Sequence, residues 1–111
     1  MDLSQVLPTG TPADKLTLTG PDAIVAQARD LLSDAIMIHN GYTHELEVLS
    51  ETEATGIWAM EDRVIFPDGV GCPFPFRRSH NFGRYYEDYR KVDGRWKISR
   101  LKLIRLWQEL S

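Results

Sequence analysis

Apolar residues in the first third of the chain recur with the spacing of a helix. Pro21 and Asp22 open this segment, and proline at the first helical position followed by an acid is typical of a helix start. The next apolar residues fall on one stripe at 3.6 residues per turn: Ile24, Val25, Ala28, Leu31, Leu32 and Ala35. The polar residues between them, including Gln27, fall on the opposite face. The pattern predicts a helix over residues 21–37 that ends before the strong terminator Asn40-Gly41.

From Gly41 onward, apolar and polar residues alternate, which is the pattern of half-buried strands. Turn residues divide this part into four predicted strands: Tyr42–Leu49, Ala54–Phe66, His80–Val92 and Arg95–Trp107. Asp93-Gly94 is a strong hairpin signal, because the two-residue turn needs positive φ at both positions. A short strand is also predicted over Lys15–Thr19, within an otherwise irregular N-terminal segment. Strands of about 13 residues usually bend, so we expect the sheet to wrap around the helix.

The composition is that of a single globular domain. The chain has 111 residues, of which 42% are hydrophobic and 26% are charged, and chains of this size usually form one core. The net charge of −3 argues against a nucleic-acid-binding surface and against binding to anionic membranes. No apolar run approaches the roughly 18–20 residues of a membrane span, and no signal peptide is evident, so we expect a cytoplasmic protein.

Few residues are placed for metal or covalent chemistry. The single cysteine, Cys72, lies in a proline-rich loop and is expected to be inert, because thiol reactivity needs a stabilised thiolate. The histidines, His39, His44 and His80, lack the spacing of a zinc or iron site, and no phosphate loop or nucleophile motif is present. His80 follows two arginines and is expected to be a solvated loop residue, with anion binding as the alternative. We therefore expect no metal and no cofactor.

Several stretches of the sequence match the pattern of one superfamily. They are Ile38-His39-Asn40-Gly41, Ala54-Thr55-Gly56 and the hairpin Tyr89–Ile98, in which an Asp-Gly turn precedes Trp-Lys and an aliphatic residue. Gly20–Ile24 also suits the start of the third helix in that pattern. The chain resembles the nuclear-transport-factor-two-like superfamily, and more closely its polyketide-cyclase-like branch with scytalone dehydratase and hexachlorocyclohexane dehydrochlorinase. The likeness covers residues 20–107.

The resemblance implies one α+β domain over residues 1–111. Its mainly antiparallel sheet would be cone-shaped and strongly curved, wrapping a helix as in the cystatin-like α+β barrel, around a deep apolar pocket. Members of this branch usually begin with two further helices, whereas about 20 irregular residues precede the predicted helix here. The domain is therefore expected to be N-terminally short.

The resemblance also implies a general base. In the enzymatic members, a histidine at the end of the third helix abstracts a proton without a cofactor and is oriented by an aspartate on the first helix. His39 matches this histidine, but no residue here matches the aspartate, and Val64 stands where the dehydratase has a second catalytic histidine. From the residues alone, His39 could instead cap the end of the helix through the helix dipole.

Asp62 is a candidate substitute for the missing aspartate. It shares strand parity with Trp58, Met60 and Val64, and the resemblance implies that this face of the strand lines the pocket. Asp62 would then approach the base from the sheet rather than from a helix. Alternatively, the end of the strand frays and Asp62 is solvated.

The predicted strand His80–Val92 presents two faces. The resemblance favours the Tyr85 face as the inward one, where the tyrosine hydroxyl would hold a substrate oxygen. Alternatively, Tyr85 is a core residue whose hydroxyl bonds only to other groups of the protein. Glu87 lies on the same face and, like a carboxylate from a second chain, is an alternative partner for His39. The other face suits cross-strand ion pairs or an oligomer interface, and it carries Arg84, Asp88 and Arg90.

These features predict a domain that binds a small apolar or aromatic molecule and that, if catalytic, acts on it as a cofactor-free lyase or isomerase. His39 would be the base, Tyr85 a hydrogen-bond donor and Asp62 the carboxylate. The expected apolar walls are Trp58, Met60, Val64, Leu101 and Leu103. The alternative is a non-catalytic interaction module of the same fold. Apolar sheet left uncovered by the missing helices predicts a homodimer or homotrimer.

Overall fold

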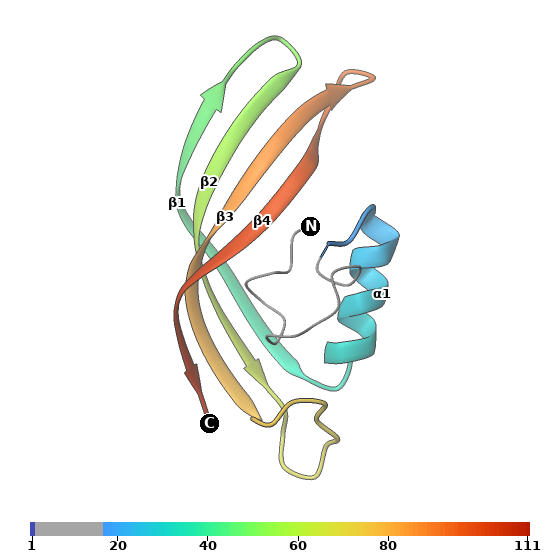
Figure 1. Ribbon diagram of the computed structural model, residues 1–111, viewed down its shortest axis with the longest axis vertical. Helices are drawn as coiled ribbons and strands as arrows, with labels where there is room; N and C mark the ends of the chain where they lie inside the picture. The colour runs from blue at the N-terminus through green and yellow to red at the C-terminus, as the bar shows by residue number, and fades with distance from the viewer. Residues whose placement is uncertain (2–16) are drawn as a thin grey trace.

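One helix and four long strands make up the described part of the chain, residues 1 and 17–111 of a computed structural model. Helix α1 (Pro21–Leu32) is followed by strands β1 (Ile36–Val48), β2 (Glu53–Ile65), β3 (Arg78–Val92) and β4 (Arg95–Leu110). The strands form one antiparallel sheet in chain order, and α1 lies on the concave side of its lower half (Figure 1). The predicted α+β fold with a curved antiparallel sheet is confirmed. Of the strand predicted over Lys15–Thr19, Lys15 and Leu16 lie outside the described residues, and the other three form an isolated bridge at Thr17 rather than a strand.

Helix α1 is shorter than its apolar stripe predicts, because the residues after it join the sheet. It ends at Leu32, and a turn closed by the Ala35 amide donating to the Leu32 carbonyl over 3.0 Å leads into β1. Residues 36–38 then pair with residues 63–65 of β2, and branched apolar side chains favour this pairing. The prediction that the helix continues to Met37 is therefore wrong, and β1 begins at Ile36 rather than at Tyr42.

Bulges in β1 and β4 change which side chains face inward. The register between β1 and β2 shifts between Gly41 and His44, and the register between β3 and β4 shifts after Phe82 and again after Asp88. One extra residue in a strand reverses the alternation of side chains beyond it. The pairing therefore gives β4 the following inward positions: Trp96, Ile98, Leu101, Leu103, Arg105, Gln108 and Leu110.

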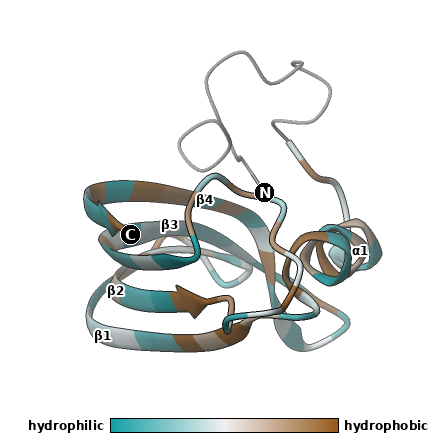
Figure 2. Cartoon of the chain, turned by 90° about the horizontal axis from the view of Figure 1, so that it is seen from below, coloured by the Kyte–Doolittle hydropathy of each residue, from teal (hydrophilic) through white to brown (hydrophobic). Residues whose placement is uncertain are grey.

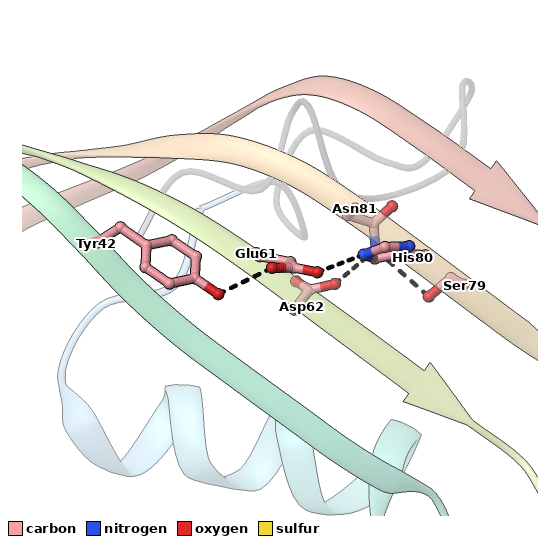
Figure 3. A network of polar contacts seen from close by, with 6 residues as sticks. All are labelled: Tyr42, Glu61, Asp62, Ser79, His80 and Asn81. Carbon is pink, nitrogen blue, oxygen red and sulfur yellow. Dashed lines mark hydrogen bonds and ion pairs between the residues drawn. The ribbon is translucent and has the colours of Figure 1, made fainter.

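The outer, convex face of the sheet carries an aromatic and polar cluster. The Phe82 and Trp107 ring centroids lie 5.8 Å apart, and the His80 ring lies 4.8 Å from Phe82. The Tyr42 hydroxyl donates to Glu61 Oε2 over 2.9 Å, and His80 Nε2 lies 2.6 Å from Glu61 Oε1 (Figure 3). The bond to His80 holds the pKa of Glu61 below its usual value, and the bond to Glu61 raises the pKa of Tyr42. His80 thus belongs to β3 and to this network, so its expected place in a solvated loop is wrong.

The loop between β2 and β3 is held by aromatic packing and by hydrogen bonds to its own backbone. Phe74 stacks on Phe76 with ring centroids 5.2 Å apart and meets Phe66 edge-on at 5.9 Å. Arg77 Nη2 donates to two carbonyls of the loop, and the Cys72 thiol donates to the Phe76 carbonyl over 3.1 Å. These contacts fix the loop as a wall at one end of the sheet, and Cys72 lies in a loop as predicted.

Helix α1 adds little to the packed core. The buried apolar side chains of the described residues are Met60, Phe66 and Leu103, and α1 contributes none. Seen from below, α1 lies across the opening of the curved sheet (Figure 2). With 12 residues, this one helix of the described chain is too short to cross a membrane. The helix therefore closes a space against the sheet instead of filling it.

Candidate functional site

A cavity of about 270 Å³ separates α1 from the inner face of the sheet. Its apolar lining comes mainly from the helix, the sheet and the β2–β3 loop: Ile24, Ala28, Leu31, Leu32, Met37, Val64, Phe74, Phe76 and Leu103. Its polar lining consists of Gln27, His39, Asp62, Ser79, Tyr85, Arg105 and Gln108. The volume lies just below the roughly 300–1,000 Å³ of drug-sized sites. A small, largely apolar molecule fits this space.

The face of α1 that lines the cavity differs in two positions from its predicted apolar stripe. Val25 is 52% exposed, whereas Gln27, which was expected on the polar face, lines the cavity. The helix is therefore turned so that one amide side chain joins the apolar lining.

Four polar side chains form a row across the sheet beside the cavity. His39 on β1 pairs with Asp62 on β2, Asp62 pairs with Asn81 on β3, and Asn81 pairs with Gln108 on β4. Directly paired residues of antiparallel strands have Cβ atoms about 4.5–5.5 Å apart. The strand register therefore places the predicted base and the predicted carboxylate next to each other on one face.

Asp62 is buried rather than solvated. It is 4% exposed, and Asn81 Nδ2 donates to Asp62 Oδ1 over 2.6 Å and to Ser79 Oγ over 3.4 Å (Figure 3). A short hydrogen bond from a fully buried amide fixes the carboxylate in place. Asp62 thus lines the cavity, as the resemblance implied for its face of the strand, and the alternative in which it frays into solvent is wrong.

His39 lines the cavity from β1, at a solvent-exposed part of the wall. It lies inside the strand, so the prediction that it ends or caps the helix is wrong. The cause is the pairing of residues 36–38 with β2, which replaces the last helical turn by sheet. Within residues 1 and 17–111 no hydrogen bond holds the His39 ring, which leaves both ring nitrogens available to a ligand.

Tyr85 lines the cavity from β3, on the face that was predicted to point inward. Burial raises the pKa of its hydroxyl, and the nearby charges of Asp62 and Glu87 raise it further. The hydroxyl is therefore protonated at neutral pH and can donate a hydrogen bond. On the opposite face of β3, Arg90 Nη2 lies 3.9 Å from Glu53 Oε1 in an exposed pair, which stabilises the sheet little.

Arg105 lines the cavity from β4, and the sequence patterns did not single it out. Burial lowers the pKa of its guanidinium, and the charges of Asp62 and Tyr85 offset part of this effect. In a regular strand Arg105 would share a face with Trp107, but the bulge between them turns only Arg105 inward. Inward residues of a regular strand are two positions apart, whereas Ile98 and Leu101 are three positions apart. This spacing was the signal in the sequence that β4 contains a bulge.

The apolar walls differ in part from expectation. Val64 and Leu103 line the cavity, whereas Trp58, Met60 and Leu101 do not. The Trp58 ring instead stacks on His44 at 4.3 Å, its Nε1 donates to the Tyr89 hydroxyl over 2.8 Å, and Met60 is buried in the core. The β1 bulge explains the stack, because it turns His44 to the inner face opposite Trp58.

Charged side chains around the cavity are few. Glu87 accepts a hydrogen bond from the Tyr89 hydroxyl and does not line the cavity, so Asp62 is the carboxylate that faces it among the described residues. Within that same part of the chain, no group of three or more His, Cys, Asp or Glu side chains is arranged to hold a metal ion. The cavity thus combines an apolar lining with one imidazole, one carboxylate, one phenol and one guanidinium.

Comparisons with known proteins agree on the fold. A family model described as the SnoaL-like domain matches residues 6–102. The structure is similar to that of a hexachlorocyclohexane dehydrochlorinase, LinA Type2, with a TM-score of 0.72 and 22% identity over 91% of this chain and 66% of that one. It is also similar to the Kfla4162 protein from Kribbella flavida, with a TM-score of 0.63 and 21% identity over 78% of this chain and 56% of that one. The chain therefore spans about two thirds or less of either neighbour, and at these identities the likeness concerns the fold.

Proposed function

Because the chain belongs to the SnoaL-like domain family of the nuclear-transport-factor-two-like superfamily, we propose that its cavity binds a small apolar or aromatic molecule. We further propose that the domain acts on this molecule as a cofactor-free lyase or isomerase, with His39 as the general base. The observation that carries the proposal is the direct pairing of His39 with the buried Asp62 at the cavity. A base beside a fixed carboxylate is the usual arrangement for proton abstraction.

In this proposal each polar group has one task. His39 removes a proton from a carbon atom of the bound molecule, and the Asp62 carboxylate stabilises the imidazolium that forms. The electron pair left on carbon either expels a leaving group from the neighbouring carbon, as in a lyase, or moves onto a conjugated carbonyl oxygen, as in an isomerase. The protonated Tyr85 hydroxyl donates a hydrogen bond to that oxygen and stabilises its developing charge. Asp62 would thereby take the task that an aspartate on the first helix has in related enzymes.

The binding step is tested with a neutral aromatic probe, 2-naphthamide, and two matched tryptophan variants of α1. Ala28→Trp places a large ring at a position that lines the cavity, whereas Ala26→Trp places the same ring on the exposed face of the helix. We expect titration calorimetry to show at least a tenfold loss of probe affinity for Ala28→Trp, because the ring occupies the space of the probe. Ala26→Trp should bind as the unmodified protein does. Equal binding by all three proteins would place the probe elsewhere and contradict the proposal.

One observation favours the second candidate function, a non-catalytic interaction module. The far ends of the two hairpins carry large apolar residues at inward positions that remain exposed: Leu46 (56%), Val48 (73%), Trp96 (47%) and Ile98 (55%). Exposed apolar patches beyond a few hundred Å² usually mark an interface. This part of the concave face lies beyond α1 (Figure 1), so a second copy of the chain could cover it.

This candidate predicts a homodimer or homotrimer at micromolar concentration. Multi-angle light scattering should report two or three times the mass of the chain, because leaving the apolar patch in water costs roughly 25 cal/mol per Å². A Val48→Lys, Ile98→Lys double variant should shift the population toward the monomer, while Phe82→Lys, on the outer face, serves as the control for the other side of the sheet. A cooperatively folded monomer of the unmodified protein would refute this prediction.

A further inference from the structure

Each strand of the sheet contributes one ionisable or phenolic side chain to the cavity. They are His39 from β1, Asp62 from β2, Tyr85 from β3 and Arg105 from β4. The proposed proton transfer uses the first three and leaves Arg105 without a task. Arg105 is also the one cationic side chain among the described residues that line this space.

Arg105 has no direct partner within the described part of the chain. No hydrogen bond or ion pair joins its guanidinium to residues 1 or 17–111, and its Nε atom is buried without a hydrogen-bond acceptor. Asp62 acts on it only through the field of its charge, since the hydrogen bond to Asp62 comes from Asn81. A largely buried cation without a partner is costly for the fold. A bound molecule that carries an anionic oxygen would supply the missing acceptor.

The backbone is built so that Arg105 faces inward. Gly83 pairs with Arg105 at the β4 bulge, and a Cβ atom at Gly83 would overlap the Ile104 carbonyl oxygen and lie 3.2 Å from the Arg105 Cα. Glycine on β3 therefore permits the close approach that the bulge requires. The inward direction of Arg105 thus rests on a specific local structure.

On this basis, and resting on the ligand-binding function proposed above, we propose that Arg105 binds a carboxylate group of the ligand. The cavity then selects small apolar carboxylic acids over neutral molecules of the same shape. A guanidinium presents its donors in a planar fork that matches a carboxylate, and such charge-assisted bonds are stronger than neutral ones. The apolar lining receives the remainder of the molecule.

The positions of Arg105 and His39 also set the orientation of the ligand. They lie on β4 and β1, the two edges of the four-stranded sheet. Neighbouring strands are about 4.8 Å apart, so three spacings separate them by roughly 14 Å along the sheet, and its curvature shortens the direct path. A ring-sized acid held at Arg105 extends over Asp62 and Tyr85 toward His39. The carboxylate and the reacting carbon therefore lie at opposite ends of the ligand.

A purely structural task for Arg105, as a counter-charge to Asp62, predicts a different result. Replacing a counter-charge changes the stability of the fold, but it does not change how the cavity discriminates between a charged and a neutral ligand. The relative affinity for an acid and its amide separates the two tasks.

The test compares 2-naphthoate with 2-naphthamide, which share size and shape and differ in charge. Titration calorimetry is carried out on the unmodified full chain, Arg105→Met, Arg105→Lys and Arg100→Met, and thermal unfolding confirms that each variant is folded. Arg100 is the matched control, because it lies on β4 but lines a groove of the outer face. We expect the unmodified protein and Arg100→Met to bind the acid roughly tenfold or more tightly than the amide. Arg105→Met should bind both probes equally, and Arg105→Lys should keep part of the preference.

The outcomes separate this inference from the function on which it rests. Binding of the amide without a preference for the acid, or a preference that persists in Arg105→Met, would overturn the task of Arg105 while the binding cavity stands. Binding of neither probe by the unmodified protein would contradict the binding function, and the inference would fall with it. If Arg105→Met does not fold, a reduced preference for the acid in folded Arg105→Lys supports the inference, and a preference as large as that of the unmodified protein overturns it.

Discussion

Replacing His39 by alanine is expected to lower the rate of base-promoted proton abstraction in the cavity by about 10²–10⁴-fold, the usual contribution of a general base. The reaction is followed with 5-nitrobenzisoxazole, an aromatic probe whose ring opens to a coloured phenolate when a base removes its ring proton. His39 is the imidazole that lines the cavity, and its strand neighbour Asp62 is fixed by Asn81. Without the imidazole, the described part of the lining holds no second imidazole beside a carboxylate.

His44→Ala is the matched control for this experiment. His44 lies on the same strand, but its ring stacks on Trp58 at 4.3 Å and does not line the cavity. Its removal should leave the rate within about twofold of the unmodified protein, since it holds no place in the proton transfer. Equal losses in both variants, or an unchanged rate in His39→Ala, would contradict the assignment of the base.

Replacing Gly83 by alanine is expected to lower the free energy of unfolding by about 1–3 kcal/mol, the usual cost of forcing an added group into a packed site. The added methyl group would overlap the Ile104 carbonyl oxygen, which is backbone and cannot rotate away. Either the bulge rearranges or the two strands separate locally. Urea unfolding followed by circular dichroism measures the change.

Gly41→Ala provides the comparison. Gly41 also lies in a strand at a bulge, yet nothing lies within 4 Å of the Cβ that it would carry. Alanine there should be neutral or slightly stabilising, because it restricts the unfolded chain without a clash. A cost at Gly41 as large as that at Gly83 would show that any added side chain, and not the close approach to β4, is responsible.

The uninterrupted alternation of β2 and β3 sorted their residues into two faces, but it did not show which face points inward. The family resemblance chose the faces of Asp62 and Tyr85, and both residues line the cavity. The hairpin at Asp93-Gly94 could also be predicted from the sequence, and both residues adopt the positive φ that the turn requires. Local turn chemistry was sufficient to predict the hairpin.

The faces of β1 and β4 could not be predicted in the same way. The position of a bulge depends on the partner strand and cannot be read from one strand alone. The sequence therefore did not indicate that Arg105 and Gln108 face inward or that Trp107 faces outward. The end of α1 had a similar cause: helical spacing continues to Ala35, but pairing with β2 converts the following residues to strand. Asn81, which is fully buried and holds Asp62, gains its importance only from the register of three strands.

Helix α1 contributes no buried side chain to the core, and this has a consequence for the lifetime of the protein. A molecule in the cavity would pack between the helix and the sheet and would complete the core from within. A ligand present at 100 times its dissociation constant adds about 2.7 kcal/mol to the stability of the folded state. Proteases act on opened forms whose population falls with that stability. The amount of this protein in a cell would then rise and fall with the supply of its own ligand.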